Sequence, residues 1–188
     1  MTTTTTSHLI PGLAPGTWTI DPAHSEVSFS VRHMMVSKVR GRFSAVEGEI
    51  VIGDGPADSS VTAAVDVRSF DTGNADRDAH IRSADFLDAE THPTMTYRSS
   101  AVRPDGDGYV VDGELTLRGV TRPVALALEV GGVTTDPSGD LRLGLSATTE
   151  INRRHFGIDL SMPLESGGVV VGDKIKVNLD IAAVRPAA

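Results

Sequence analysis

Apolar and polar side chains alternate with a period of two residues through most of this chain. Between residues 25 and 33, for example, Val27, Phe29 and Val31 are separated by single polar residues. Successive side chains on a β-strand point to opposite faces, so this period places the apolar side chains on one face of a sheet. The chain is therefore predicted to be all-β, with eight strands at about residues 25–33, 39–52, 60–69, 94–102, 109–118, 123–132, 140–150 and 173–184.

The segments between the predicted strands contain the residues that tight turns need. Glycine, aspartate and proline are concentrated in GDGPADS, RPDGDG and DPSGD, and LTLRGVTRPVALAL has the pattern of a hairpin with Gly119 at its tip. Strands joined by such turns pair antiparallel. We favour an eight-stranded antiparallel barrel, because closure removes exposed sheet edges, and a sandwich is the alternative. Within residues 39–52 the alternation changes phase, which predicts a bulge near Ala45.

Two short segments interrupt the strands and are predicted to cap the barrel. In TGNADRDAHIRSADF, Asn74 or Asp76 is a suitable N-cap for a helix of about two turns. The helix is expected to turn three apolar side chains toward the sheet, namely Ala79, Ile81 and Phe86. The second segment, INRRHFGID, is predicted to form a turn or short helix that ends at Gly157.

A single domain is expected for the 188 residues, which are enough to bury a full-sized core. We predict a β-barrel domain over residues 17–188 and a disordered tail over residues 1–16, because the threonine run there has little apolar surface to bury. No stretch approaches the roughly 20 apolar residues of a membrane-spanning helix, so stable membrane insertion is not expected. The start of the sequence also lacks the basic and apolar regions of a secretory signal, which predicts a cytoplasmic location.

Composition and motifs exclude several classes of function. The formal net charge of -8 argues against a nucleic-acid partner, since phosphate-binding surfaces need a basic excess. The chain has no cysteine, which excludes disulfides and thiol chemistry. It also lacks a nucleophile elbow, a phosphate-binding loop, a dinucleotide-binding motif and a zinc-protease motif, and its six histidines stand singly. We therefore expect no metal, no other cofactor and no enzyme activity.

The interior of the predicted barrel has two possible states. Eight strands form a barrel that is either just filled by side chains or holds one small ligand. Large side chains are scarce, with one tryptophan, two tyrosines and five phenylalanines, which favours residual apolar volume. Leucines and the five methionines are nevertheless able to fill the interior. Composition therefore leaves a filled and a hollow barrel open.

The segment RDAHIRSADF, at residues 77–86, is unusually dense in acidic and basic side chains. Such a group can supply an acid, a base and an anion clamp, but no nucleophile is paired with it in the sequence. We favour a structural interpretation, in which Arg77, Asp78 and His80 fasten a short cap. The apolar side of this cap, formed by Ile81 and Phe86, is expected to face the cavity.

Four motifs in this chain resemble one known family in both order and spacing: WTIDPAHSEVSFSVRHMMVSKVRGRF, GNADRDAHIRSADFLDAETHPTMTYRS, GELTLRGVTRPV and INRRHFGID. Over about residues 17–184 the chain is similar to the YceI-like polyisoprenoid-binding proteins. The resemblance implies an elongated, lipocalin-like barrel whose apolar cavity holds a long isoprenoid or a similar amphiphile, often in a dimer. It places the hallmarks of the family on Asp21, His24, Ser25, His33, Gly41, Arg77, Asp78, His80, Phe86, Asn152, Arg153 and Phe156.

These inferences predict a protein that binds, stores or transports a long-chain amphiphilic lipid without catalysis. Polyisoprenoids, polyprenyl quinones and fatty-acid derivatives are the expected ligands, and a homodimer is a possible assembly. The alternative is an enzyme that acts on an isoprenoid-type lipid, with His80, Asp78 and His24 as acid–base groups. The side chains expected to contact the ligand are His24, Phe29, His33, Phe43, Arg77, His80, Ile81, Phe86, Met95, Leu117, Leu143, Arg153 and Phe156.

Overall fold

The computed structural model describes residues 10–162, 164–165, 167 and 170–187. Strands dominate these residues, which confirms the predicted all-β class. The strands are β1 (Gly16–Ile20), β2 (Glu26–His33), β3 (Ser37–Phe43), β4 (Val46–Ile52), β5 (Ser60–Asp66), β6 (Phe70–Asp71), β7 (Thr94–Asp105), β8 (Gly108–Leu117), β9 (Val120–Pro123), β10 (Leu126–Thr135), β11 (Leu141–Asn152) and β12 (Val171–Arg185). The helices are α1 (Ala75–Arg82) and the short 3-10 helices η1 (Pro22–His24), η2 (Pro56–Asp58), η3 (Val67–Ser69) and η4 (Arg153–Phe156).

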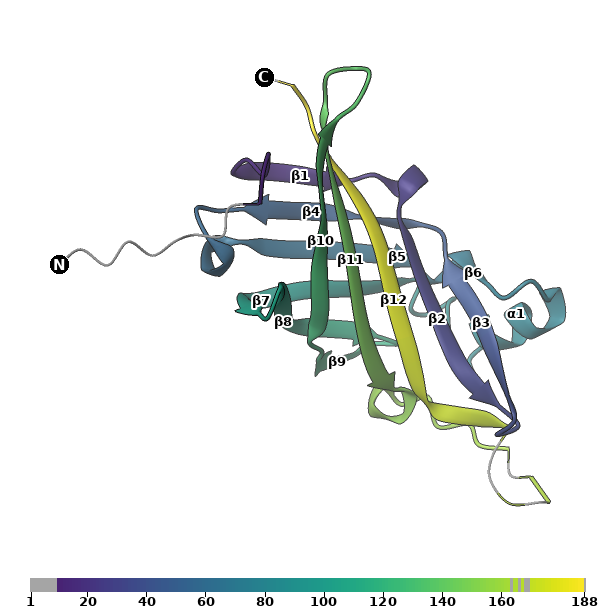
Figure 1. The fold of residues 1–188 in the computed structure, drawn as a ribbon. Helices are drawn as coiled ribbons and strands as arrows, with labels where there is room; N and C mark the ends of the chain where they lie inside the picture. The colour runs from purple at the N-terminus through teal and green to yellow at the C-terminus, as the bar shows by residue number, and fades with distance from the viewer. Residues whose placement is uncertain (1–9, 163, 166, 168–169, 188) are drawn as a thin grey trace.

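The strands close into one antiparallel barrel. Hydrogen bonding runs from β1 through β4, β5, β7, β8, β10 and β11 to β12, and β12 pairs with β1 again, so eight strands complete the ring. In Figure 1, strands β10, β11, β12 and β2 cross steeply in front of β4, β5, β7 and β8, as expected for a strongly twisted closed sheet. The predicted eight-stranded barrel is confirmed, and the alternative of a sandwich is wrong.

Two courses of the barrel are bent strands. The helix η1 separates β1 from β2, and both of these strands pair with β12. Only Ser44 and Ala45 separate β3 from β4, which pair with β2 and β1 respectively. The phase change near Ala45 therefore corresponds to a real bend in the chain. The alternation did not predict β1, because this short strand contains only two inward apolar residues, Trp18 and Ile20.

The predicted hairpin around Gly119 is also confirmed. Leu117 of β8 pairs with Val120 of β9, and the two turn residues, Arg118 and Gly119, have φ angles of 51° and 73°. Two consecutive positive φ angles are characteristic of the tight turn that matches the twist of paired strands. The strand predicted at 123–132 is divided, because β9 ends before residue 124 and β10 begins at residue 126.

Residues 72–93, which contain α1, connect β6 to β7 and lie against the barrel at the right of Figure 1. Asn74 is the N-cap, with its side chain accepting a hydrogen bond from the Arg77 amide at 2.9 Å. Ile81 packs against the core and Phe86 is buried, as predicted, whereas Ala79 is exposed and its predicted inward direction is wrong. Each helical residue turns the chain by about 100°, so the inward position of Ile81 directs Ala79 away from the barrel.

The described chain starts inside the segment that was predicted to be a tail. Leu13 packs against the core, and the Trp18 indole donates a hydrogen bond to the carbonyl oxygen of Ala14 at 3.2 Å. Trp18 is fully buried, so this contact fixes the chain just before β1 at the barrel. The threonine run of the predicted tail lies outside the described residues.

Candidate functional site

The barrel encloses a cavity of about 550 Å³, within the range of roughly 300–1,000 Å³ that is common for small-molecule sites. It extends along the barrel from Leu13 and Pro56 at one end to His33 and Val171 at the other. Aliphatic and aromatic side chains from most of the strands form the greater part of its wall. Of the two alternatives left open by the composition, the barrel is therefore the hollow one. The scarcity of aromatic residues was the feature of the sequence that favoured it.

Most of the side chains predicted to contact a ligand lie on the wall of this cavity. They are Phe29, His33, Phe43, Arg77, Ile81, Phe86, Met95, Leu117, Leu143 and Arg153. Three others, His24, His80 and Phe156, are not on the wall. Phe156 is almost completely buried, but it packs into the core beside the cavity.

The histidines His24 and His80 lie on the outside of the barrel. Their side chains are 67% and 46% exposed, and they pair with Asp21 at 2.8 Å and with Asp85 at 3.0 Å. The ring of His80 also packs edge-on against Phe86, with 5.2 Å between the ring centroids. Neither imidazole faces the cavity, so the expected ligand contacts of both residues are not supported by their positions.

The polar side chains of RDAHIRSADF mainly hold the cap in place. Asp78 is buried, and its carboxylate accepts hydrogen bonds from the backbone amide and the hydroxyl group of Thr72. Arg77 donates from Nε to the Thr72 hydroxyl at 2.8 Å and from Nη2 to the Thr72 carbonyl at 3.2 Å. Both side chains thus fix the end of β6 to the start of α1, which agrees with the structural interpretation of this segment.

Arg153 closes the cavity near the start of β12. Its side chain is only 4% exposed and donates to the carbonyl oxygens of Ile158 at 2.7 Å and Gly172 at 3.0 Å. It also lies 3.2 Å from the carboxylate of Asp173. Burial lowers the pKa of the Arg153 guanidinium below its ordinary value, while Asp173 counteracts this effect. Because most of its donors are occupied, Arg153 acts mainly as a brace of the cavity wall.

Sequence reasoning missed Tyr97, which lines the cavity from β7. The hydroxyl group donates to the carbonyl oxygens of Val124 at 2.9 Å and Val111 at 3.2 Å. The Tyr97 hydroxyl thereby holds the segment between β9 and β10 in place. Burial, reinforced by the charge of Asp112, raises the pKa of Tyr97 to about 12. The inward position follows from the same alternation that predicted β7, so the sequence did contain a signal for it.

Sequence reasoning also missed Arg118, for which no comparable signal exists. From the turn between β8 and β9, its guanidinium donates to the carbonyl oxygens of Ala84 and Gly157. These two carbonyls belong to the segment after α1 and to the end of η4. Arg118 therefore connects three segments that are distant in sequence.

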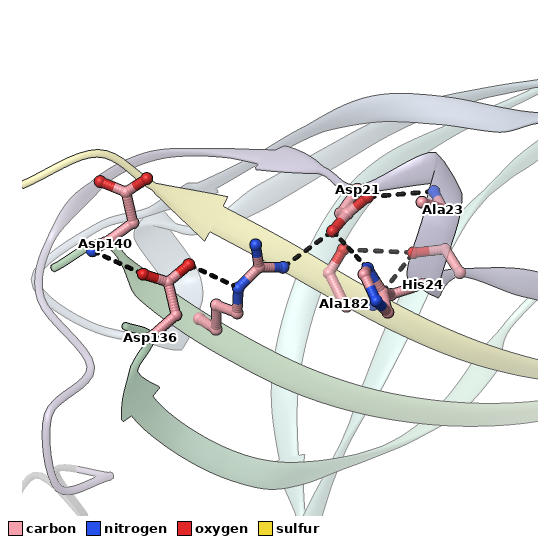
Figure 2. A network of polar contacts seen from close by, with 8 residues as sticks. Asp21, Ala23, His24, Asp136, Asp140 and Ala182 are labelled. Carbon is pink, nitrogen blue, oxygen red and sulfur yellow. Dashed lines mark hydrogen bonds and ion pairs between the residues drawn. The ribbon is translucent and has the colours of Figure 1, made fainter. Parts of the chain in front are cut away.

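A polar network closes the barrel beside the C-terminal end of β12. The guanidinium of Arg142 donates to Asp21 and to Asp136, each at 2.8 Å, and Figure 2 shows these two carboxylates on either side of it. Arg142, and secondarily His24, lowers the pKa of Asp21 from its usual 3.8 to about 2. Ser25 adds hydrogen bonds to both backbone groups of Ala182. The hallmark residues Asp21 and Ser25 thus fasten η1 to the sheet, and His24 pairs with Asp21.

The closed antiparallel ring, the bent first strands and the long apolar cavity define a lipocalin-like barrel. The family profile of the YceI-like domain matches residues 18–183, and the chain belongs to this family. A UPF0312 protein of Vibrio cholerae (strain M66-2) is 41% identical over 140 residues, which are 73% of this chain and 74% of that protein. A UPF0312 protein of Pseudomonas aeruginosa (strain LESB58) is 34% identical over 140 residues, covering 74% and 73% of the two chains.

Solved structures share the same fold. The YCEI protein of Campylobacter jejuni matches with a TM-score of 0.70 and 26% identity, over 83% of this chain and 90% of that chain. A polyisoprenoid binding domain from Saccharophagus degradans, described as implicated in plant cell wall breakdown, has a TM-score of 0.69. Its identity is 16%, over 92% of this chain and all of that domain, so this likeness concerns the fold.

No helix in the described part of the chain is long and apolar enough to cross a bilayer.

Proposed function

We propose that this protein binds a long-chain amphiphilic lipid inside its barrel, without catalysis. The observation that carries the proposal is the long cavity of about 550 Å³ with its mainly apolar wall. Apolar cavities of this kind favour apolar ligands over water. The polyisoprenoid-binding description of the Saccharophagus degradans domain supports an isoprenoid chain or a polyprenyl quinone as the ligand, and the apolar wall also suits a fatty-acid derivative.

The polar groups of the wall support recognition that depends mainly on the tail. Arg77, Tyr97 and Arg153 all line the cavity, but each donates hydrogen bonds to protein oxygens. Burial of a lipid tail contributes about 0.8 kcal/mol per methylene, so burial of ten methylenes offsets much of the free-energy cost of association. We therefore expect broad tolerance of head groups.

Binding without catalysis is further supported by the positions of the candidate acid–base groups. Asp78 is buried against Thr72, whereas His24 and His80 pair with other carboxylates on the outer surface. The three side chains thus occupy separate environments, and neither histidine faces the space that would hold a lipid. A cytoplasmic location and a homodimer stay predictions, which cell fractionation and analytical ultracentrifugation would test.

The proposal predicts that purified protein releases a lipid when it is denatured and extracted with organic solvent, as detected by mass spectrometry. A variant with Ala147→Phe should retain much less lipid, because Ala147 is buried on the cavity wall and a larger side chain occupies the space of the ligand. Ala127→Phe is the matched control, since Ala127 is exposed on β10. Absence of lipid from the native protein, together with no thermal stabilisation by added prenyl or fatty-acyl lipids, would contradict the proposal.

A further inference from the structure

Exposed apolar side chains gather at the turn between β2 and β3. Met34, Met35 and Val36, called the hairpin tip below, are 46%, 52% and 85% exposed. A fourth exposed residue, Met162, lies at the same end, because Val170 bonds through its backbone to both Met34 and Met162. Among the described residues, Val51 is the remaining large apolar residue with comparable exposure. Apolar surface that is concentrated in this way marks a site of contact with a partner.

The geometry of the turn does not explain the methionines. Met34 and Met35 have φ angles of 50° and 63°, in the left-handed region where a non-glycine residue costs about 1 kcal/mol or more. Asparagine and glycine adopt this conformation far more easily and are the usual residues of such turns. The chain therefore holds two large apolar side chains in solvent on a backbone that favours neither of them.

A group of cations surrounds the hairpin tip. It is called the basic strip and consists of Arg32, Lys38, Arg40, Lys174 and Lys176, which alternate with inward apolar residues on β2, β3 and β12. All three lysines of the chain belong to this strip, although the formal net charge of the protein is -8. Five of the 17 lysines and arginines thus lie together on one outer surface of an acidic molecule.

The basic strip is poorly compensated by the protein itself. Arg32 lies directly opposite Lys38 in the ladder between β2 and β3, and such like-charge pairs destabilise a sheet. Within the described residues, only Lys174 of the strip has an ion-pair partner, Glu150 at 3.8 Å. The nearby acid Asp173 is already paired with two arginines outside the strip. This charge distribution fits an anionic partner.

The cavity reaches the base of the same hairpin. Val31 and His33 of β2, Val39 of β3 and Val171 of β12 all line it. His33 also pairs directly with Ser37 across the hairpin. The exposed turn is therefore joined directly to a residue of the cavity wall, with no other element between them. An occupant of the cavity would therefore have one end close to the hairpin tip.

We propose that the hairpin tip and the basic strip dock this end of the barrel onto an anionic lipid bilayer. The tip enters the boundary between head groups and acyl chains, while the strip contacts the anionic head groups. The end of the cavity then faces the membrane, where a lipid tail can pass between the bilayer and the barrel. This role in lipid exchange rests on the proposed lipid binding, whereas the docking itself does not.

The test is sedimentation of the full chain with vesicles. Vesicles made from equal amounts of phosphatidylcholine and phosphatidylglycerol should bind the protein, and vesicles of phosphatidylcholine alone should not. Removal of three charges, by Arg32→Gln, Lys38→Gln and Arg40→Gln, should weaken binding by at least about tenfold, since each cation near an anionic surface contributes severalfold in affinity. High salt should have a similar effect because it screens the charges.

The tip is tested separately by Met34→Asn combined with Met35→Gly. These residues suit the left-handed turn, so the variant should be at least as stable as the wild type and yet bind anionic vesicles more weakly. The control for charge is Arg68→Gln, Arg98→Gln and Arg122→Gln, which removes three exposed arginines outside the strip. This control should sediment like the wild type.

Three outcomes would overturn the docking proposal. In the first, the wild type does not sediment with anionic vesicles. In the second, the variant of the basic strip sediments like its charge control. In the third, analytical ultracentrifugation shows that the hairpin tip mediates self-association instead. Failure of the proposed lipid binding is distinguishable, because it appears as missing lipid in the organic extract of the wild type together with no thermal stabilisation by added lipids. A protein that contains lipid but does not sediment contradicts docking alone.

Discussion

At the scale of single residues, Asp21 joins three parts of the barrel. Its carboxylate accepts hydrogen bonds from the Ala23 amide at 3.0 Å and from Arg142 at 2.8 Å, and it contacts His24 at 2.8 Å. Its backbone amide donates to Ala182 on β12. Asp21 therefore caps η1 and also fixes the bend between β1 and β2 to the last two strands.

The lowered pKa of Asp21 predicts a defined dependence of stability on pH. The folded-state pKa of about 2 lies below the usual 3.8, so the ionised carboxylate stabilises the fold above about pH 4, and this contribution is lost as the pH falls toward 2. Asp21→Asn should lower the free energy of unfolding near pH 6, because it removes the negative charge of the ion pair. The expected loss is only about 1 kcal/mol, since solvent screens part of this ion pair. Urea unfolding across this pH range should show the difference from wild type shrinking below pH 4.

The exposed pair of Arg103 and Asp112 provides the control for Asp21. Asp112→Asn removes one carboxylate from a hairpin surface, so its effect on the free energy of unfolding should be smaller. If Asp21→Asn were equally destabilising at pH 6 and pH 2, the ion pair with Arg142 would not be the source of its effect.

At the scale of elements, the cap illustrates which parts of the fold could be predicted from the sequence. Asn74 has a side chain suited to an N-cap, so the start of α1 could be predicted from local chemistry alone. The barrel followed in the same way from the alternation, because each strand independently shows which face is apolar. Ala79 was placed wrongly, since a small apolar side chain gives little indication of direction.

Other elements of the site depend on contacts that local sequence does not encode. Arg118 bonds to Ala84 and Gly157, which are 34 and 39 residues away, and only the closed barrel brings them together. For the same reason His24 and His80 could not be separated from the true wall residues. Their motif neighbours line the cavity, whereas their own side chains point outward to Asp21 and Asp85.

The contacts of Arg118 predict that it stabilises the cap. Arg118→Ala should lower the free energy of local opening of residues 83–89 by about 1 kcal/mol, because it removes two hydrogen bonds to this segment and to η4. Amide hydrogen exchange in these residues should become roughly fivefold faster, while exchange in the central strands stays unchanged. The measurement is hydrogen exchange resolved by residue.

Arg122→Ala is the control for Arg118. Arg122 is a neighbouring exposed arginine whose side chain, among the residues that the structure describes, bonds only to the adjacent Thr121 carbonyl at 3.4 Å. Exchange in residues 83–89 should be the same in this variant as in the wild type. Equal acceleration in both variants would show that loss of positive charge, rather than loss of the cap contacts, loosens the segment.

At the scale of the whole molecule, closure and bending of the strands produce both the cavity and its two ends. The ring is completed where β12 pairs with β1, and farther along β12 pairs with β2 instead. The cavity therefore continues beneath both halves of the bent course, from the loop between β4 and β5 to the hairpin between β2 and β3. A space lined by residues from both of these regions suits one extended chain better than a compact ligand.

This shape predicts that affinity depends on the length of the ligand. In a series of saturated fatty acids, each added methylene should contribute about 0.8 kcal/mol, which is roughly fourfold in Kd, until the chain fills the cavity. Further methylenes then remain in water, so the Kd should reach a plateau. Isothermal titration calorimetry of protein stripped of bound lipid measures both the slope and the plateau. Ala147→Phe should move the plateau to shorter chains, and a Kd that does not change with chain length would contradict an extended tail in the barrel.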